Sequence, residues 1–126
     1  MEFYCMAKKI LLVDDDKDWR LLVDSSLRES GYEVITATDV TEAMAHMDQD
    51  QLDLLILDLD LAGENGLLLM EFLNVNRPAL PIIVYSSFPE DDEASSNLTN
   101  ERAQLYLQKG SMKELVEAIE SILRGG

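Results

Sequence analysis

The sequence contains one cysteine and comparatively few positive charges. Cys5 is the only cysteine among 126 residues, so no internal disulfide can form. A single cysteine favours a reducing compartment, and we expect a cytoplasmic protein. Lys and Arg total 10 against 25 Asp and Glu, a net charge of −15. That charge argues against direct binding to nucleic acid or to an anionic membrane surface, because both present phosphates, and it suits a basic partner or a bound cation.

Long apolar runs are also missing. No stretch approaches the ~20 apolar residues that a membrane-spanning helix needs, so no transmembrane segment is expected. The opening Met1–Met6 lacks the charged start and apolar stretch of a signal peptide. We expect it to be a leader, added by cloning or by an upstream start codon, before one domain at residues 7–126. With 47% apolar residues, a chain of this length can bury a core without disulfides.

Short apolar runs alternate with helical patterns along the chain. The runs predict five strands, at residues 9–13, 32–36, 54–57, 82–85 and 105–107. Apolar residues three and four apart predict helices between them. The first helix runs from Asp18 to a stop before Gly31, and its expected inner face is Trp19, Leu22, Val23 and Leu27.

Later helices have their own start signals. Thr38 or Asp39 can cap the second, and Ser111 with Glu114 forms a capping box for the last. A third helix is expected at 67–75, whereas the polar segment Pro89–Arg102 would give a helix only a thin apolar face. Strands alternating with helices predict an α/β fold, a doubly wound five-stranded parallel sheet with helices on both faces.

In such a sheet the binding crevice lies outside the carboxyl ends of the strands. Polar residues gather there along this sequence. They are Asp14, Asp15 and Asp16 after the first strand, Asp58 and Asp60 at the third, Ser86 and Ser87 after the fourth, and Lys109 after the fifth. Each alone has an ordinary reading, as a turn residue, a cap or a surface charge. Their gathering at one sheet edge favours a shared chemical role.

Carboxylates crowded together repel one another unless a cation lies among them. Oxygen ligands without His or Cys favour Mg²⁺, with Mn²⁺ as an alternative, over zinc. A carboxylate beside the metal can attack a phosphoryl group and form an aspartyl phosphate. The Ser86 hydroxyl and the Lys109 ammonium group would then stabilise the transferred oxygens.

At these residues the chain resembles the receiver domains of two-component response regulators, including the single-domain chemotaxis type. The resemblance covers about residues 8–123 and implies a flavodoxin-like (βα)5 fold. It also implies a phosphorelay function, in which a sensor histidine kinase or histidine phosphotransfer protein phosphorylates Asp58 and the altered face binds an output partner. No enzymatic activity is implied beyond Mg²⁺-dependent self-phosphorylation and self-dephosphorylation.

The resemblance also assigns roles to single residues. Asp15 would bind the metal directly, Asp14 mainly through water, and Asp60 through its backbone carbonyl, beside the phosphoacceptor Asp58.

A second set of residues would serve the phosphoryl group and the switch. Ser86, with Ser87 beside it, matches the hydroxyl residue that binds the phosphoryl group. Tyr106 matches the aromatic switch residue, and Lys109 matches the lysine of the family.

Some positions depart from the family pattern. Ala62 and Gly110 stand where prolines are usual, and Arg102-Ala103 replaces a usual Gly-Ala pair. These departures leave the chemistry intact but bear on how Lys109 is aimed and on the strength of switching.

Two other functions fit parts of the sequence. Leu-Ile-Leu-Asp-Leu-Asp at 55–60 also resembles the first motif of haloacid-dehalogenase-like phosphatases. That family needs a further acidic motif after its lysine, and here only Glu114, Glu117 and Glu120 of a helix follow. The other alternative is a pseudo-receiver, a docking module that works without phosphorylation, and the complete acidic set argues against it.

Overall fold

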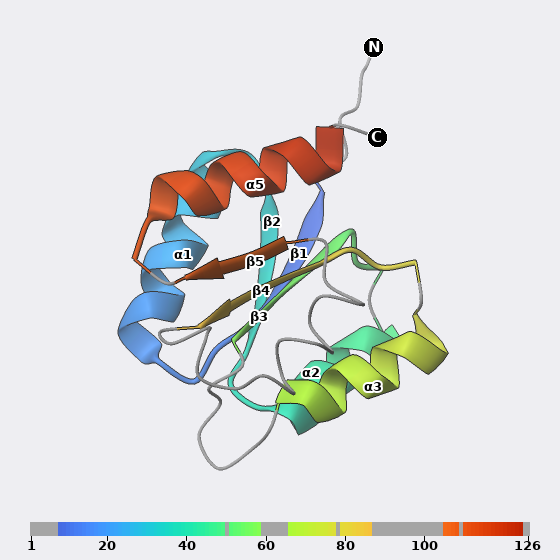
Figure 1. Cartoon of the computed structure of the whole chain (residues 1–126). Helices are drawn as coiled ribbons and strands as arrows, with labels where there is room; N and C mark the ends of the chain where they lie inside the picture. The colour runs from blue at the N-terminus through green and yellow to red at the C-terminus, as the bar shows by residue number, and fades with distance from the viewer. Residues whose placement is uncertain are drawn as a thin grey trace.

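The computed structural model describes residues 8–49, 51–58, 66–77, 79–86, 105–108 and 110–124. The expected leader at 1–6 and the polar segment at 89–102 lie outside these ranges. Nine elements follow one another in the described residues, and Figure 1 shows how they are arranged. They are β1 (Lys9–Val13), α1 (Lys17–Glu29), β2 (Glu33–Ala37), α2 (Val40–Gln49), β3 (Leu54–Asp58), α3 (Gly66–Asn76), β4 (Ile82–Ser86), β5 (Leu105–Gln108) and α5 (Met112–Arg124).

The five strands form one sheet in the order β2-β1-β3-β4-β5, and each described pair is parallel. Helices α1 and α5 lie on one face and α2 and α3 on the other (Figure 1). The predicted doubly wound α/β sheet is therefore confirmed. Its order changes direction at β1, so the carboxyl ends of β1 and β3 border the crevice expected for this kind of sheet.

The central strands are apolar because both of their faces are covered. Every residue of β3 is buried, and successive β1 side chains enter opposite cores. Leu11 packs toward α2 and α3, whereas Leu12 packs toward α1 and α5. Burial of apolar area stabilises a fold by about 25 cal/mol per Å² removed from water. The two cores therefore hold the sheet firmly in place beneath the residues at its carboxyl edge.

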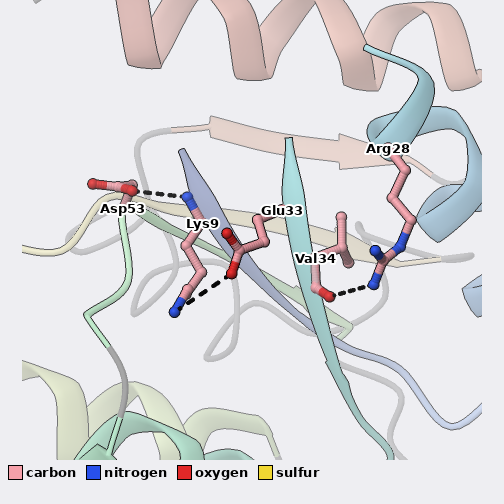
Figure 2. Close-up of polar contacts among 5 residues, drawn as sticks. All are labelled: Lys9, Arg28, Glu33, Val34 and Asp53. Atoms are coloured by element: carbon pink, nitrogen blue, oxygen red, sulfur yellow. Dashed lines mark hydrogen bonds and ion pairs between the residues drawn. The ribbon is translucent and has the colours of Figure 1, made fainter. Parts of the chain in front are cut away.

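Polar contacts tie the strands together at the amino-terminal edge (Figure 2). The Lys9 backbone N–H donates to Asp53 Oδ2 at 2.8 Å, and Lys9 Nζ lies 3.6 Å from Glu33 Oε1. Arg28 Nη2 donates to the Val34 carbonyl oxygen at 2.9 Å, which joins the end of α1 to β2. These contacts all lie at the edge opposite the carboxyl ends of the strands.

Several helix signals behave as predicted. Gly31 has φ +97°, a left-handed conformation that suits glycine directly after α1. The Asp39 carboxylate accepts from the Glu42 N–H at 2.8 Å, and the Ser111 hydroxyl accepts from the Glu114 N–H at 3.2 Å. None of the described helices is both long and apolar enough to cross a membrane.

Two sequence predictions need correction. The second strand spans Glu33–Ala37, one residue later than expected, because Tyr32 still belongs to the turn that closes α1 and donates its N–H to the Leu27 carbonyl. Leu22 was expected in the core but is 53% exposed. A helix turns about 100° per residue, so Leu22 lies a quarter-turn or more away from the line through Val23 and Leu27, which are buried.

Candidate functional site

Three carboxylates meet at the carboxyl ends of β1 and β3. Asp14 and Asp15 follow β1, and Asp58 is the last residue of β3. One carboxylate oxygen from each lies within 4.8 Å of the others, which makes them the acidic group suited to a metal ion in the described part of the chain. Asp14 and Asp58 are buried, at 0% and 1% exposure, while Asp15 is exposed. The sequence analysis expected these three carboxylates to lie close together, and the structure places them so.

The donor set fits a hard divalent cation. Mg²⁺ binds oxygen at about 2.1 Å, so two of its ligands are at most about 4.2 Å apart. A group of oxygens within 4.8 Å of one another can reach that spacing with small side-chain movements. Two buried carboxylates also need a positive charge nearby, because burial removes the water that would otherwise screen their repulsion.

Several hydrogen bonds hold Asp14 in place, among them one from its own N–H to the Ala37 carbonyl oxygen at 3.0 Å. Its Oδ1 accepts from the Asp16 N–H at 2.9 Å, and its Oδ2 accepts from the Tyr85 hydroxyl at 2.5 Å. Arg20 Nη1 donates to the Asp14 carbonyl oxygen at 3.0 Å. Burial, followed by the charges of Asp14 and Asp58, raises the pKa of Tyr85 far above its ordinary value. The phenol therefore stays neutral and remains a donor.

Asp16, the third acid of the run, belongs to the helix that follows. Its Oδ1 accepts from the N–H groups of Asp18 and Trp19 at 3.0 and 3.2 Å, so it is the N-cap of α1. These two bonds satisfy N–H groups of the first turn that have no partner within the helix. The acidic run thus divides into residues 14 and 15, which face Asp58, and residue 16, which starts α1.

The structure describes the remaining predicted site residues only in part. Ser86 ends β4 and its backbone pairs with Gln108, the last residue of β5, while Tyr106 pairs with Val84. Lys109 follows Gln108 directly in the sequence. Asp60, Ser87 and Lys109 lie outside the described residues, as do the side chains of Ser86 and Tyr106.

Sequence reasoning missed the residues that support Asp14. The sequence predicts Tyr85 only as the end of a strand and Trp19 only as a core residue. A tyrosine in a buried strand needs a partner for its hydroxyl, and an acid at the edge of the same sheet is a natural acceptor. That signal could have found Tyr85, whereas the contact of Arg20 with a backbone carbonyl leaves no trace in the sequence.

The family follows from a comparison over most of the chain. A family model described as "Response regulator receiver domain" matches residues 10–120. The chain belongs to this receiver family. Receiver domains are signalling modules of two-component systems, and the paired acids with Asp58 are typical of members that accept a phosphoryl group. The phosphatase alternative loses its basis, because the match spans the whole βα pattern and not one short motif.

Relatives support the same assignment. The chain is 30% identical over 119 residues to the alkaline phosphatase synthesis transcriptional regulatory protein PhoP of Bacillus subtilis, covering 94% of this chain and 50% of that protein. It is 28% identical over 118 residues to the transcriptional regulatory protein PrrA of Mycobacterium tuberculosis, covering 94% and 51%. The chain thus spans about half the length of these curated relatives.

Solved receiver structures agree in fold. A CheY-like receiver domain protein from Methanospirillum hungatei has a TM-score of 0.87 and 27% identity, covering 94% of this chain and 95% of that one. The response regulator TrrA of Thermotoga maritima, solved in complex with Mg(2+)-BeF, has a TM-score of 0.82 and 31% identity, covering 92% and 99%. A receiver of similar sequence thus binds magnesium together with beryllofluoride.

Proposed function

We propose that this chain is a phosphorylatable receiver in which Asp58 accepts the phosphoryl group. The observation that supports it best is the placing of Asp58, buried at the end of the central strand with its carboxylate beside those of Asp14 and Asp15. A buried carboxylate held by a rigid strand has a defined direction of attack, which favours transfer between positioned groups.

The transfer itself balances simply. An Asp58 carboxylate oxygen forms a bond to phosphorus while the bond from phosphorus to the donor's imidazole nitrogen breaks, and that nitrogen keeps the electron pair and takes up a proton. Mg²⁺, or Mn²⁺ in its place, would neutralise charge on the phosphoryl oxygens when bound. Asp14, Asp15 and the backbone carbonyl of Asp60 would hold the cation. Attack by water on the acyl phosphate would release inorganic phosphate and return the free carboxylate.

The remaining roles belong to the same proposal. The hydroxyl of Ser86, with Ser87 beside it, and the ammonium group of Lys109 would bind the transferred phosphoryl oxygens. A phosphoryl group adds about two negative charges and strong acceptor oxygens. Ser86 would donate to one of them and draw the end of β4 inward, and Tyr106 on the adjacent strand would turn into the space left. The face bearing β5 would then present a changed surface to an output protein.

The partners follow from the family and the charge. The donor would be a sensor histidine kinase or a histidine phosphotransfer protein, and the output partner a protein with a basic face that suits the net charge of −15. We also propose that the protein works in the cytoplasm, in keeping with a single cysteine.

Labelling with a small phosphoryl donor tests the proposal. Wild-type protein with acetyl phosphate and Mg²⁺ should gain one acid-labile phosphoryl group by intact mass, and EDTA should prevent it. Asp58→Asn should gain none. Asp24→Asn removes a carboxylate from an exposed α1 ion pair and should label like the wild type.

Two results would contradict it. Labelling of Asp58→Asn at the wild-type level would remove Asp58 from the acceptor role. A folded wild-type protein that binds Mg²⁺ yet never labels would favour the pseudo-receiver, a docking module independent of phosphorylation.

A further inference from the structure

The side chain of Tyr85 joins two strands that are not neighbours. Tyr85 lies on β4, and its Cα is paired with that of Asp58 on β3. Its hydroxyl nevertheless reaches Asp14 at the end of β1, on the far side of β3, with an Oη to Oδ2 distance of 2.5 Å. Both side chains are buried, Tyr85 at 2% exposure. One hydrogen bond therefore links β4 to the cluster of Asp14, Asp15 and Asp58.

The ring that carries this hydroxyl is itself restrained. The indole of Trp19, near the start of α1, lies with its centroid 6.0 Å from that of Tyr85, the planes tilted by 44°. This is a usual aromatic contact, and it limits the directions open to the phenol. Trp19 Nε1 is buried, and its N–H acts weakly on the Tyr85 hydroxyl, where it lowers the pKa of the phenol against the larger effect of burial. The indole thus supports the phenol mainly through packing.

These contacts decide how Asp14 can move. With Oδ1 bonded to the Asp16 N–H and Oδ2 to Tyr85, the carboxylate has little freedom to rotate away from its acidic neighbours. Without the phenol, repulsion from Asp15 and Asp58 would favour such a rotation. A neutral donor at Oδ2 also stabilises the ionised carboxylate without adding charge to the cluster.

We propose that Tyr85 is a positioning residue that holds the Asp14 carboxylate for a divalent cation and thereby couples cation binding to the end of β4. The inference rests on the proposed function, since it concerns the same cation site. Outer groups that orient metal ligands typically change metal affinity 10–100-fold when they are removed. Because Tyr85 directly precedes Ser86, a cation that pulls Asp14 would also pull on the strand end that binds the phosphoryl group.

Calorimetric titration with Mg²⁺ alone tests the first part. Tyr85→Phe removes only the hydroxyl, and we expect its dissociation constant for Mg²⁺ to rise about tenfold. Tyr32→Phe is the matched control, because it makes the same chemical change in the turn before β2, beside α5 and away from the carboxyl ends of the strands. It should leave the dissociation constant unchanged.

A double-mutant cycle separates positioning from general stability. If Tyr85 acts through Asp14, Tyr85→Phe should change Mg²⁺ affinity much less in an Asp14→Asn background than in the wild type. A merely structural role would give additive effects, with a lower melting temperature in both backgrounds. Additive effects would therefore overturn the proposal.

Trp19 reports the coupling, because it is the only tryptophan of the chain. Saturating Mg²⁺ should change its fluorescence in the wild type and change it less in Tyr85→Phe. Equal Mg²⁺ affinities in wild type and Tyr85→Phe would overturn the role of Tyr85 while leaving Asp58 phosphorylation standing. A wild type that binds no Mg²⁺ would overturn both proposals.

Discussion

Asp14, Asp15 and Asp16 are three identical residues in a row with three different environments. Asp14 is buried and bonded to Tyr85, Asp15 is exposed beside it, and Asp16 caps α1. Side chains leave the backbone in different directions at a strand end, so one step along the chain changes the neighbours completely. Substitutions at these three positions should therefore affect different properties, cation binding at residues 14 and 15 and helix stability at residue 16.

Asp15→Asn should weaken Mg²⁺ binding and stabilise the metal-free protein. It removes one ligand charge, so we expect the dissociation constant for Mg²⁺ to rise roughly tenfold or more. It also removes one of three repelling charges, so the metal-free melting temperature should rise by a few degrees. Titration calorimetry and thermal melts in EDTA measure the two effects.

Asp18→Asn is the control for that substitution. Asp18 is also exposed and lies in the first turn of α1, where a negative charge favours the helix by about 0.3–1 kcal/mol. Its loss should slightly lower stability and leave Mg²⁺ affinity unchanged. A metal-free melting temperature that falls in Asp15→Asn as well would contradict repulsion within the cluster.

Gly110 explains one departure from the family pattern. Its φ of +133° is a conformation that side chains with a Cβ rarely adopt, and a proline, whose φ is held near −65°, cannot adopt it at all. The turn between β5 and α5 therefore uses a backbone conformation at Gly110 that the usual proline could not adopt.

Helix α1 connects the site to the core. Its cap, Asp16, continues the acidic run, Trp19 packs against Tyr85, and further along Val23 and Leu27 are buried against the sheet. The helix therefore cannot shift along the sheet without disturbing the support of Asp14.

The two leucines of α1 give a matched test of this packing. Leu27→Ala should lower the free energy of unfolding by about 2–5 kcal/mol, because Leu27 is fully buried. Leu22→Ala makes the same change on the exposed side and should stay within about 0.5 kcal/mol. Urea unfolding of both variants measures the difference. A large loss for Leu22→Ala would mean that this surface is covered in solution.

The whole molecule carries a charge of −15 and places two buried carboxylates at one sheet edge. Repulsion of this kind destabilises the compact state, and a bound cation offsets it. The chain should therefore depend on divalent cations more than a neutral domain of the same size.

Mg²⁺ should stabilise folding by about 2.7 kcal/mol at a concentration 100 times its dissociation constant. Calorimetric melts with and without Mg²⁺, at ionic strength matched with NaCl, measure this shift. Asp58→Asn should lose most of it. If NaCl alone gave the same shift in the wild type, general screening and not a specific site would be responsible.

Much of this architecture can be predicted from the pattern of residues. Apolar runs such as Leu54–Leu57 are too short for helices and too apolar for a surface strand, so they indicate a covered parallel sheet. Once the sheet is parallel, its carboxyl ends share one edge, and Asp14, Asp15 and Asp58 are expected to meet. Periodicity was less exact about faces, since Leu22 fits the apolar spacing and yet lies outside the core.

Only the tertiary structure decided the support of the site. A hydrogen bond from Tyr85 to Asp14 joins residues 71 positions apart, and its existence depends on the strand order β1-β3-β4 and on the length of the phenol. The division of the acidic run between cluster and cap likewise depends on where α1 begins. Local patterns predict elements because their causes are local, whereas these contacts result from how the elements pack.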